Sequence, residues 1–294
     1  MLLPGLSTKS NWSALFVTVV CFLSAGIAAQ GDTIYVSNGG NGTIDKIDAN
    51  GNVSVFASGL SEPSGLAFDA HGDLYVSDFG DGKILEFAPN GGSSTFMTVP
   101  PHIVTDIAFD SAGDFYFCGS GEVDELNTNG QWFTVASGLG LPADMAFDSR
   151  GNLYVSDNTK NTVDMIDSNR TLSVFASGLD WPLGLAFDPS GNLYVANSGT
   201  DTISRITPDG SNSVFGFTGA LAGGLGVDSN GQLYATDSMG DLEAISSSGR
   251  PSIIASGLSG PAYMVIQPVP EPATNILLLT GLMGLFALRR SRQR

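Results

Sequence analysis

The chain carries few histidine and cysteine side chains for acid–base or nucleophilic chemistry. Its 294 residues contain two histidines, His71 and His102, and two cysteines, of which Cys118 lies in the body of the chain. A Ser-His-Asp triad needs a histidine held by an acid next to a nucleophile, and the sequence shows no such set. We expect His71 to be exposed in a turn and Cys118 to be a buried, inert thiol.

Carboxylates far outnumber basic side chains. The chain has 29 acidic and 12 basic residues and a formal net charge of −17. Only seven of the basic residues lie between positions 31 and 268. A protein this acidic repels phosphate backbones and anionic membrane surfaces, so we expect no nucleic-acid partner. Its carboxylates could recruit divalent cations weakly, but the sequence predicts no cofactor.

A repeated unit must position these side chains. The phrase PLGLAFDPSGNLYVAN at 182–197 recurs in variants that begin at Pro63, Thr105, Pro142 and Gly223. Its tyrosines are 40, 41, 38, 40 and 40 residues apart, and a fixed period near forty indicates a repeat architecture. The six tyrosines are Tyr35, Tyr75, Tyr116, Tyr154, Tyr194 and Tyr234.

Each repeat predicts four short antiparallel strands. A strand at 185–187 and a second at 193–195 flank a turn, in which Asp188 can accept backbone hydrogen bonds and the glycine three residues later can take a positive φ. The third strand has apolar residues three apart, as at Ile203 and Ile206, on opposite faces that must both be covered. A fourth strand closes the unit, and four strands buried on both faces are typical of a β-propeller blade.

Counting the repeats predicts an all-β fold, a six-bladed β-propeller over residues 30–268. The first strand of each repeat alternates large and small residues, which suits the innermost strand, where the blades converge. The first repeat begins at Thr33 without this strand, whereas the chain has a spare one at 262–266. Pairing the two closes the ring and removes exposed sheet edges.

Polar and aromatic residues should gather on one face of the ring, where the second strands end and the loops before the inner strands run. For residues that end second strands, we favour a capping role toward backbone N–H groups. Trp181, in a polar loop, can stack on sugars or pack against the next blade. A short loop at 119–121 leaves a notch, which is either a ligand site or a harmless deletion. The candidate binding residues are Asp78, His102, Asp106, Asp144, Asp157, Trp181, Asp237 and Tyr263.

Both ends of the chain predict targeting. Residues 1–29 combine one lysine, an apolar run at 14–23 and small residues at 24–29, the pattern of a secretory signal peptide. Residues 269–294 contain an apolar run at 276–288 followed by arginines. As a helix this run spans about 20 Å, less than a bilayer core near 30 Å. We therefore expect transient insertion in the inner membrane, with the arginines on the cytoplasmic side.

The C-terminal segment resembles the PEP-CTERM sorting signal of Gram-negative bacteria. It has Pro270, Glu271 and Pro272, then the apolar run, then Arg289 and Arg290. The resemblance implies recognition by an exosortase, removal of the tail, and release to the cell surface or an exopolysaccharide-rich matrix. An ordinary short C-terminal anchor is the alternative.

The repeats resemble NHL-type repeats and the six-bladed gluconolactonase- and regucalcin-like propellers. In such lactonases an axial divalent metal is held by Asn, Asp and Glu, and the resemblance places two of these ligands at the start of inner strands. None of the residues found there is a carboxylate or carboxamide; they are Ser64, Thr105, Ala143, Leu183, Gly223 and Ala262. Asp106 and Asp144 follow one residue later, and alternation of strand faces points them elsewhere.

The function we favour from the sequence is non-catalytic. It is an exported propeller that binds or scaffolds polysaccharide or a surface protein, at the cell surface or in the matrix. The alternative is a metal-dependent lactonase or hydrolase of the gluconolactonase-like class, with Asp106 and Asp144 as its candidate residues. Related propeller lyases rely on histidines and resemble this chain less.

Overall fold

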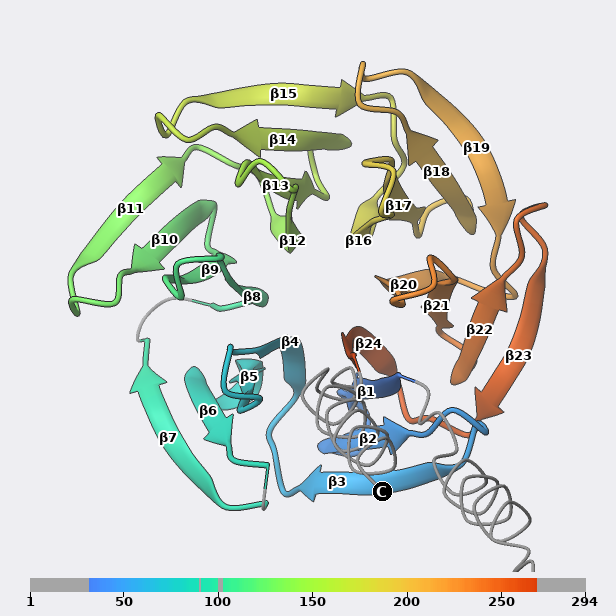
Figure 1. Cartoon of the computed structure of the whole chain (residues 1–294), viewed down its shortest axis with the longest axis horizontal. Coiled ribbons are helices and arrows are strands. Elements are labelled where there is room, and N and C mark those ends of the chain that lie inside the picture. Colours follow the sequence, from blue (N-terminus) through green and yellow to red (C-terminus); the bar gives the residue numbers. More distant parts are fainter. Residues whose placement is uncertain (1–31, 90, 100–102, 269–294) are drawn as a thin grey trace, which may run out of the picture. The chain divides into compact units, whose positions relative to one another are not determined.

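The computed structural model describes residues 32–89, 91–99 and 103–268. These residues form 24 β-strands in six four-stranded antiparallel sheets, which Figure 1 shows as blades around one axis. The predicted six-bladed β-propeller is confirmed. The predicted signal peptide and the residues of the predicted sorting signal lie outside the described residues. No helix in the described part of the chain is long and apolar enough to cross a membrane.

We number the blades in chain order and give their strands from the axis outward. Blade 1 contains β24 (Pro261–Gln267), β1 (Thr33–Asn38), β2 (Thr43–Ile47) and β3 (Val53–Ser58). Blade 2 contains β4 (Pro63–Phe68), β5 (Leu74–Asp78), β6 (Lys83–Phe87) and β7 (Ser93–Thr98), with the short 3-10 helix η1 (Phe79–Asp81) after β5. Blade 3 contains β8 (Asp106–Phe109), β9 (Phe115–Gly119), β10 (Glu122–Leu126) and β11 (Trp132–Ser137).

The other three blades follow the same order. Blade 4 contains β12 (Pro142–Phe147), β13 (Leu153–Asp157), β14 (Thr162–Ile166) and β15 (Leu172–Ser177). Blade 5 contains β16 (Pro182–Phe187), β17 (Leu193–Asn197), β18 (Thr202–Ile206) and β19 (Asn212–Phe217). Blade 6 contains β20 (Ala222–Val227), β21 (Leu233–Asp237), β22 (Asp241–Ile245) and β23 (Pro251–Ser256).

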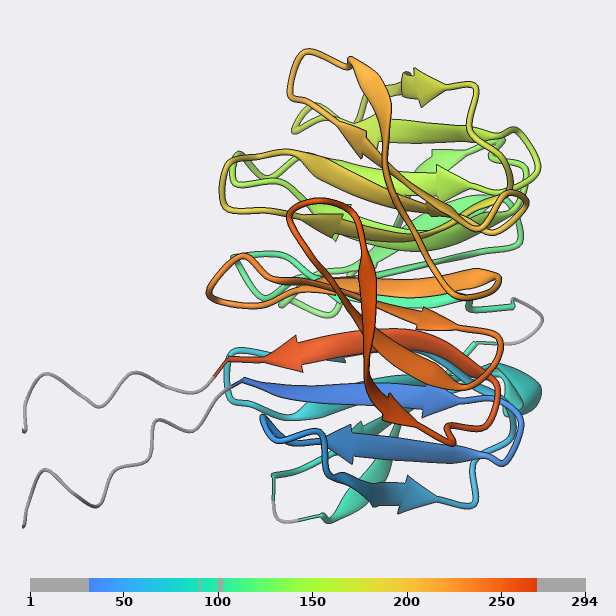
Figure 2. The same cartoon turned by 90° about the vertical axis from the view of Figure 1, so that its right-hand side faces the viewer.

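The C-terminal strand closes the ring, as predicted. Strand β24 pairs with β1 in antiparallel register, with Thr33 opposite Gln267 and Tyr35 opposite Val265. Figure 2 shows these two strands side by side. The register places Asp32 and Pro268 at the same edge of blade 1, so both ends of the described chain emerge on one face of the ring.

The two faces of the ring differ in the connections that they carry. Inner strands run from the loop face, which we define by the segments that precede them (such as 178–181), to the turn face, which we define by their hairpin turns (such as 188–191). Asp32 and Pro268 lie on the turn face, because β24 ends where the other inner strands enter their turns.

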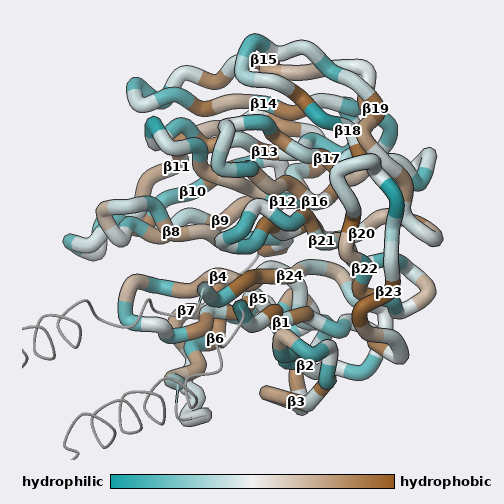
Figure 3. Tube along the Cα trace, turned by 45° about the vertical axis from the view of Figure 1, so that its right-hand side comes forward, coloured by the Kyte–Doolittle hydropathy of each residue, from teal (hydrophilic) through white to brown (hydrophobic). Residues whose placement is uncertain are grey.

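The core consists of apolar layers between neighbouring blades. In β18, Ile203 and Ile206 are fully buried, and they belong to different layers, toward blade 6 and blade 4 respectively. This confirms that both faces of the third strand are covered. The repeat tyrosines pack in these layers: the ring of Tyr154 lies 4.8 Å from Phe175 and 5.0 Å from Phe187, centroid to centroid. Figure 3 shows the corresponding recurrence of apolar residues along the strands.

The hairpin turns are fixed by their aspartates. The Oδ1 atom of Asp188 accepts hydrogen bonds from the backbone N–H groups of Ser190 and Asn192, both at 2.9 Å, and Gly191 has φ of 83°. These contacts confirm the predicted turn role and add a second hydrogen bond to it. The same arrangement occurs at Asp69, Asp110, Asp148 and Asp228.

Candidate functional site

One position of the inner strand faces the next blade at the centre of the ring, and we call it the hub position. Where it is glycine, the neighbouring backbones approach each other closely. A Cβ atom on Gly184 would lie 2.6 Å from both the backbone N of Leu225 and the backbone O of Gly223 in blade 6. In the six blades the hub position is occupied by Tyr263, Gly65, Asp106, Asp144, Gly184 and Gly224.

The two hub aspartates meet each other across neighbouring blades. Asp106 Oδ2 accepts a hydrogen bond from the backbone N–H of Met145 at 2.9 Å, and Asp144 Oδ1 accepts from the same N–H at 2.8 Å. Asp144 Oδ2 in turn accepts from Leu185 N–H in blade 5 at 2.6 Å. Both residues are buried. Strand alternation pointed these two side chains elsewhere, whereas the structure brings them together at the hub. Their carboxyl groups contact backbone N–H groups rather than an open site that a ligand could enter.

Burial and mutual repulsion keep a proton on this pair. Burial, followed by the charge of Asp144 and a hydrogen bond between the two side chains, raises the pKa of Asp106 well above its usual value. Burial raises the pKa of Asp144 to about 6, although hydrogen bonds from Asp106, Leu185 and Met145 act in the opposite direction. The two carboxyl groups therefore hold protons to higher pH than an exposed aspartate does.

The side chain of Tyr263 crosses the axis of the ring. Its hydroxyl donates a hydrogen bond of 2.7 Å to the backbone O of Ala143, which belongs to β12 in blade 4, directly across the ring from β24. Burial, with the nearby charges of Asp144 and Asp106, raises the pKa of Tyr263 well above its usual value. A neutral phenol therefore bridges two opposite blades at the hub.

The positions where lactonases carry metal ligands are engaged in contacts between blades. The hydroxyl of Ser64 donates to Thr105 O at 2.6 Å, and the hydroxyl of Thr105 donates to Pro142 O at 2.8 Å. Within 32–89, 91–99 and 103–268, no three His, Cys, Asp or Glu side chains lie close enough together to hold a metal ion. The hub residues therefore do not fit the three-ligand site of the lactonases.

The aspartates that end second strands accept hydrogen bonds from loop backbone. Asp78 accepts from Ser61 N–H at 2.7 Å and Asp157 from Gly140 N–H at 2.6 Å, both in the loops before the inner strands. Asp237 instead accepts from Met239 N–H at 3.0 Å, in the loop that directly follows it. All three aspartates are buried. Burial raises the pKa of Asp78, whereas at Asp157 the hydrogen bonds from Gly140, Leu141 and Lys160 outweigh burial and lower the pKa. These contacts agree with the capping interpretation.

Trp181 stands out from the loop face. Its side chain is 61% exposed, so it does not pack into the next blade, and its backbone has φ of 51°, an uncommon value for a non-glycine residue. The backbone is held in place because Asn161 Oδ1 accepts from its N–H at 2.9 Å and Ser198 Oγ donates to its O at 2.9 Å. The loop thus presents the indole to solvent on a backbone that two hydrogen bonds hold in place.

Trp181 belongs to a set that sequence reasoning missed. Three residues before the hub position, blades 3 to 6 all carry a large apolar side chain that is between 44% and 61% exposed. Aligning the repeats at the hub position, rather than at the tyrosine, would have revealed it. We call this set the apolar arc, and it consists of Ile103, Leu141, Trp181 and Leu221.

The remaining candidates are placed as follows. His71 is exposed and its Nδ1 lies 3.1 Å from Asp69 Oδ2. His102 lies outside the described residues. Cys118 is buried, as predicted, and burial raises the pKa of its thiol. In the short loop of blade 3, the hydroxyl oxygen of Ser120 accepts from Ile103 N–H at 3.1 Å, so the preceding loop is tied to this notch.

Comparisons with known proteins support the propeller fold and the sorting signal at the C-terminal end of the chain. Residues 268–292 match the PEP-CTERM protein-sorting motif. No curated protein matches the sequence. Among solved structures, a chain of the nidogen/laminin complex is 19% identical with a TM-score of 0.73, covering 80% of this chain and 98% of that one.

Two enzymes are among the other similar structures. A gluconolactonase from Xanthomonas campestris is 17% identical with a TM-score of 0.66, over 83% of this chain and 95% of the enzyme. The virginiamycin B lyase from Staphylococcus aureus is 14% identical with a TM-score of 0.63, over 81% and 92%. At these identities the similarity shows the propeller fold alone.

Proposed function

We propose that this exported protein is a non-catalytic binding propeller of the bacterial cell surface or exopolysaccharide matrix. The sorting motif at 268–292 indicates export and implies processing by an exosortase. The observation that carries the binding role is the apolar arc, because a water-exposed side chain of this kind at the same position of four successive blades has no role in the core.

The ligand proposed for the apolar arc is a neutral or amine-bearing polysaccharide. An indole exposed on a rigid loop can stack on the apolar face of a sugar ring, and flanking aliphatic side chains extend that surface. The large excess of carboxylates in the propeller disfavours anionic polymers.

Retention in gels that contain a neutral polysaccharide tests this proposal. Replacing Trp181→Ala should reduce retention about fivefold, which corresponds to about 1 kcal/mol for one aromatic contact. Trp132→Phe is the matched control, because Trp132 lies on β11 and packs against Phe117 at 4.8 Å. Equal retention of the Trp181 and Trp132 variants would contradict the role of the arc.

Fluorescence gives a second measurement. Trp12 lies in the predicted signal peptide, so in the Trp132→Phe variant the emission of the mature propeller comes from Trp181 alone. Sugar stacking should shift this emission to shorter wavelength, because the exposed indole loses contact with water. Absence of both retention and an emission change with all neutral and amine-bearing glycans would overturn the polysaccharide proposal.

The buried acid pair supports one alternative, a lactonase or hydrolase of the gluconolactonase-like class. Carboxyl groups with raised pKa values at the axis of a ring are candidates for acid–base chemistry. Stoichiometric calcium or zinc in the purified protein, together with lactone turnover that Asp144→Asn abolishes, would establish this alternative. We expect neither, because the pair is buried and its carboxyl groups bond to each other and to the backbone N–H groups of Met145 and Leu185.

The proposed function includes a processing step, in which the C-terminal tail inserts transiently in the inner membrane and is then removed. Mass spectrometry of the exported protein should show a C-terminus upstream of Arg289. An intact Arg294 on the exported protein would mean that the tail acts as an ordinary anchor instead.

A further inference from the structure

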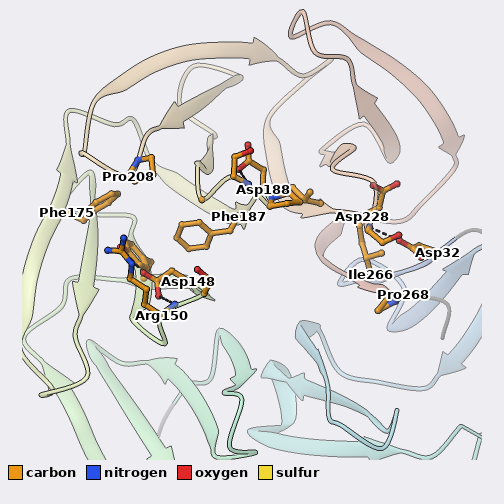
Figure 4. Close-up of a pocket in the computed structure, with 17 residues that line it drawn as sticks. Asp32, Asp148, Arg150, Phe175, Phe187, Asp188, Pro208, Asp228, Ile266 and Pro268 are labelled. Atoms are coloured by element: carbon orange, nitrogen blue, oxygen red, sulfur yellow. Dashed lines mark hydrogen bonds between the residues drawn. The ribbon is translucent and has the colours of Figure 1, made fainter. Parts of the chain in front are cut away.

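The turn face contains a cavity on the side of the ring opposite the apolar arc. It has a volume of about 660 Å³, within the range of about 300–1,000 Å³ that is common for small-molecule sites. Turns of three successive blades contribute to its wall, with Asp148 from blade 4, Asp188 from blade 5 and Asp228 from blade 6. Figure 4 shows these side chains around the cavity, with Phe187 between Asp148 and Asp188.

The closing blade explains where this cavity lies. Blades 2 to 6 each have a hairpin turn between inner and second strands, but in blade 1 these strands come from opposite ends of the propeller. Asp32 and Pro268 line the cavity at the place of the missing turn. Asp32 Oδ2 also accepts from Ser229 N–H in the turn of blade 6 at 2.8 Å, which fixes this edge.

The charge of the wall is strongly negative and held in position. Asp148 and Asp188 are each fixed by their own turn, and the side-chain amide of Asn192 donates to Asp188 Oδ2 at 2.7 Å. Although burial acts against it, hydrogen bonds from Asn152 and Arg150 lower the pKa of Asp148. Arg150 supplies the one guanidinium among the described lining residues, and its side chain forms no ion pair or hydrogen bond with a described residue.

The floor of the cavity is apolar. Phe175, Phe187, Val227 and Ile266 contribute to the lining, and all four are partly exposed. Phe175 and Phe187 each pack one side against Tyr154. An aromatic surface next to carboxylates suits a cation that carries an apolar body, since ring faces and carboxylates both attract positive charge.

We propose that this cavity binds an organic cation, a protonated amine or guanidinium carried on an apolar or planar body. The carboxylates hold the charged group and the phenylalanine floor holds the body. An acidic group on the same ligand would pair with Arg150. This site is separate from the apolar arc, because it lies on the other face and Tyr263 bridges the hub between the two faces, so it is independent of the proposed polysaccharide binding.

The chain itself supplies a substitution that removes charge and keeps the turn. In the β10–β11 hairpin, Asn127 Oδ1 accepts from Asn129 N–H at 3.1 Å and from Gln131 N–H at 2.9 Å, the same backbone contacts that the turn aspartates make. Asn127 Nδ2 donates to Gln131 Oε1, and a turned Asn192 amide can offer its oxygen to an asparagine at 188 in the same way. The double variant Asp188→Asn with Asp228→Asn should therefore fold like the wild type. Asp69→Asn with Asp110→Asn is the matched control, because it removes two identical turn charges from blades 2 and 3, which do not line the cavity.

Calorimetric titration with tryptamine, and with its neutral isostere tryptophol, tests the proposal. Tryptamine should bind the wild type saturably and at least about tenfold more tightly than tryptophol. The Asp188/Asp228 variant should lose at least about tenfold in tryptamine affinity, and the Asp69/Asp110 control should stay within about twofold. Equal losses in both variants, equal binding of the two probes, or no saturable binding of tryptamine would overturn the proposal.

A mapping experiment keeps the test valid if a variant fails to fold. In amide NMR spectra of the wild type, tryptamine should shift the signals of Ser190 and Ser229 on the turn face and leave those of Leu141 and Leu221 on the loop face unchanged. Shifts confined to the loop face would show that the amine uses the apolar arc, which would contradict this second site without affecting the proposed function.

Discussion

The hub aspartates act as spacers between inner strands. Glycine at the hub position lets two backbones approach directly, as the N–H of Gly65 does when it donates to Thr105 O at 3.1 Å. Where the position is aspartate, the carboxyl reaches the N–H group of the next blade instead. Asp106 and Asp144 thus connect blades 3, 4 and 5 in sequence.

The acid pair makes stability depend on pH. Folding raises the pKa of both carboxyl groups, so the folded chain holds more protons than the unfolded chain. The stability that the pair contributes is complete below about pH 4, the usual range of an aspartate. It is lost as the pH rises through the raised pKa values of the pair, which are about 6 for Asp144 and well above the usual value for Asp106.

Asp106→Asn should remove the part of this loss that comes from the Asp106 proton. The amide can donate to the Asp144 carboxylate and accept from Met145 N–H, as the protonated acid does, without a proton to lose. We expect thermal melts to show the variant about 2–4 °C above the wild type at pH 8, the shift that about 1 kcal/mol causes in a domain of this size, with a smaller difference at pH 5. A difference that does not grow with pH would contradict the assignment; Asp110→Asn, in an outer turn, is the control.

For single residues, the sequence identified the candidate polar and aromatic side chains but did not predict their contacts in the folded chain. Asp106 and Asp144 are visible as the polar members of the hub position. Their shared contact with Met145 N–H depends on the distance between two blades, which no spacing along the chain encodes. The exposure of Trp181 was likewise undecided, because the left-handed backbone that turns its side chain outward is set by Asn161 and Ser198.

The hairpin is the element that the sequence predicted best. Its aspartate, glycine and flanking strands recur in five blades, and turn chemistry is local, so each copy predicts its own contacts. The loops before the inner strands were less predictable. In blades 2 and 4 their conformation depends on Asp78 and Asp157, which end a strand that follows 16 or 17 residues later.

Asp110→Ala should show how much one turn contributes. It removes the two hydrogen bonds to Ala112 and Asp114 N–H, and we expect a loss of about 1–2 kcal/mol in the free energy of unfolding. Asp110→Asn should be within about 0.5 kcal/mol of the wild type, because asparagine already makes this turn at Asn127. Denaturant titration measures both, and equal losses would show that charge rather than turn geometry is what matters.

At the scale of the whole propeller, closure and the arrangement of sites depend on one strand. Strand β24 completes blade 1, carries Tyr263 across the hub, and ends at Pro268, where the sorting motif begins. The chain therefore leaves the ring on the turn face, next to the acidic cavity, while the apolar arc lies on the other face. If the propeller is attached to a surface through its C-terminus, the apolar arc faces away from the attachment point.

Deleting residues 263–267 should abolish this organisation. Without β24, the inner edge of β1 has unpaired backbone groups and a row of buried side chains becomes exposed, which invites edge-to-edge association. We expect the deletion to produce aggregates in size-exclusion chromatography or a melt without a cooperative transition. Tyr263→Phe is the control, because it keeps the strand and removes the hydroxyl that donates to Ala143 O, which should lower stability by about 1 kcal/mol. A monomeric deletion variant that melts as sharply as this control would mean that the ring does not need its closing strand.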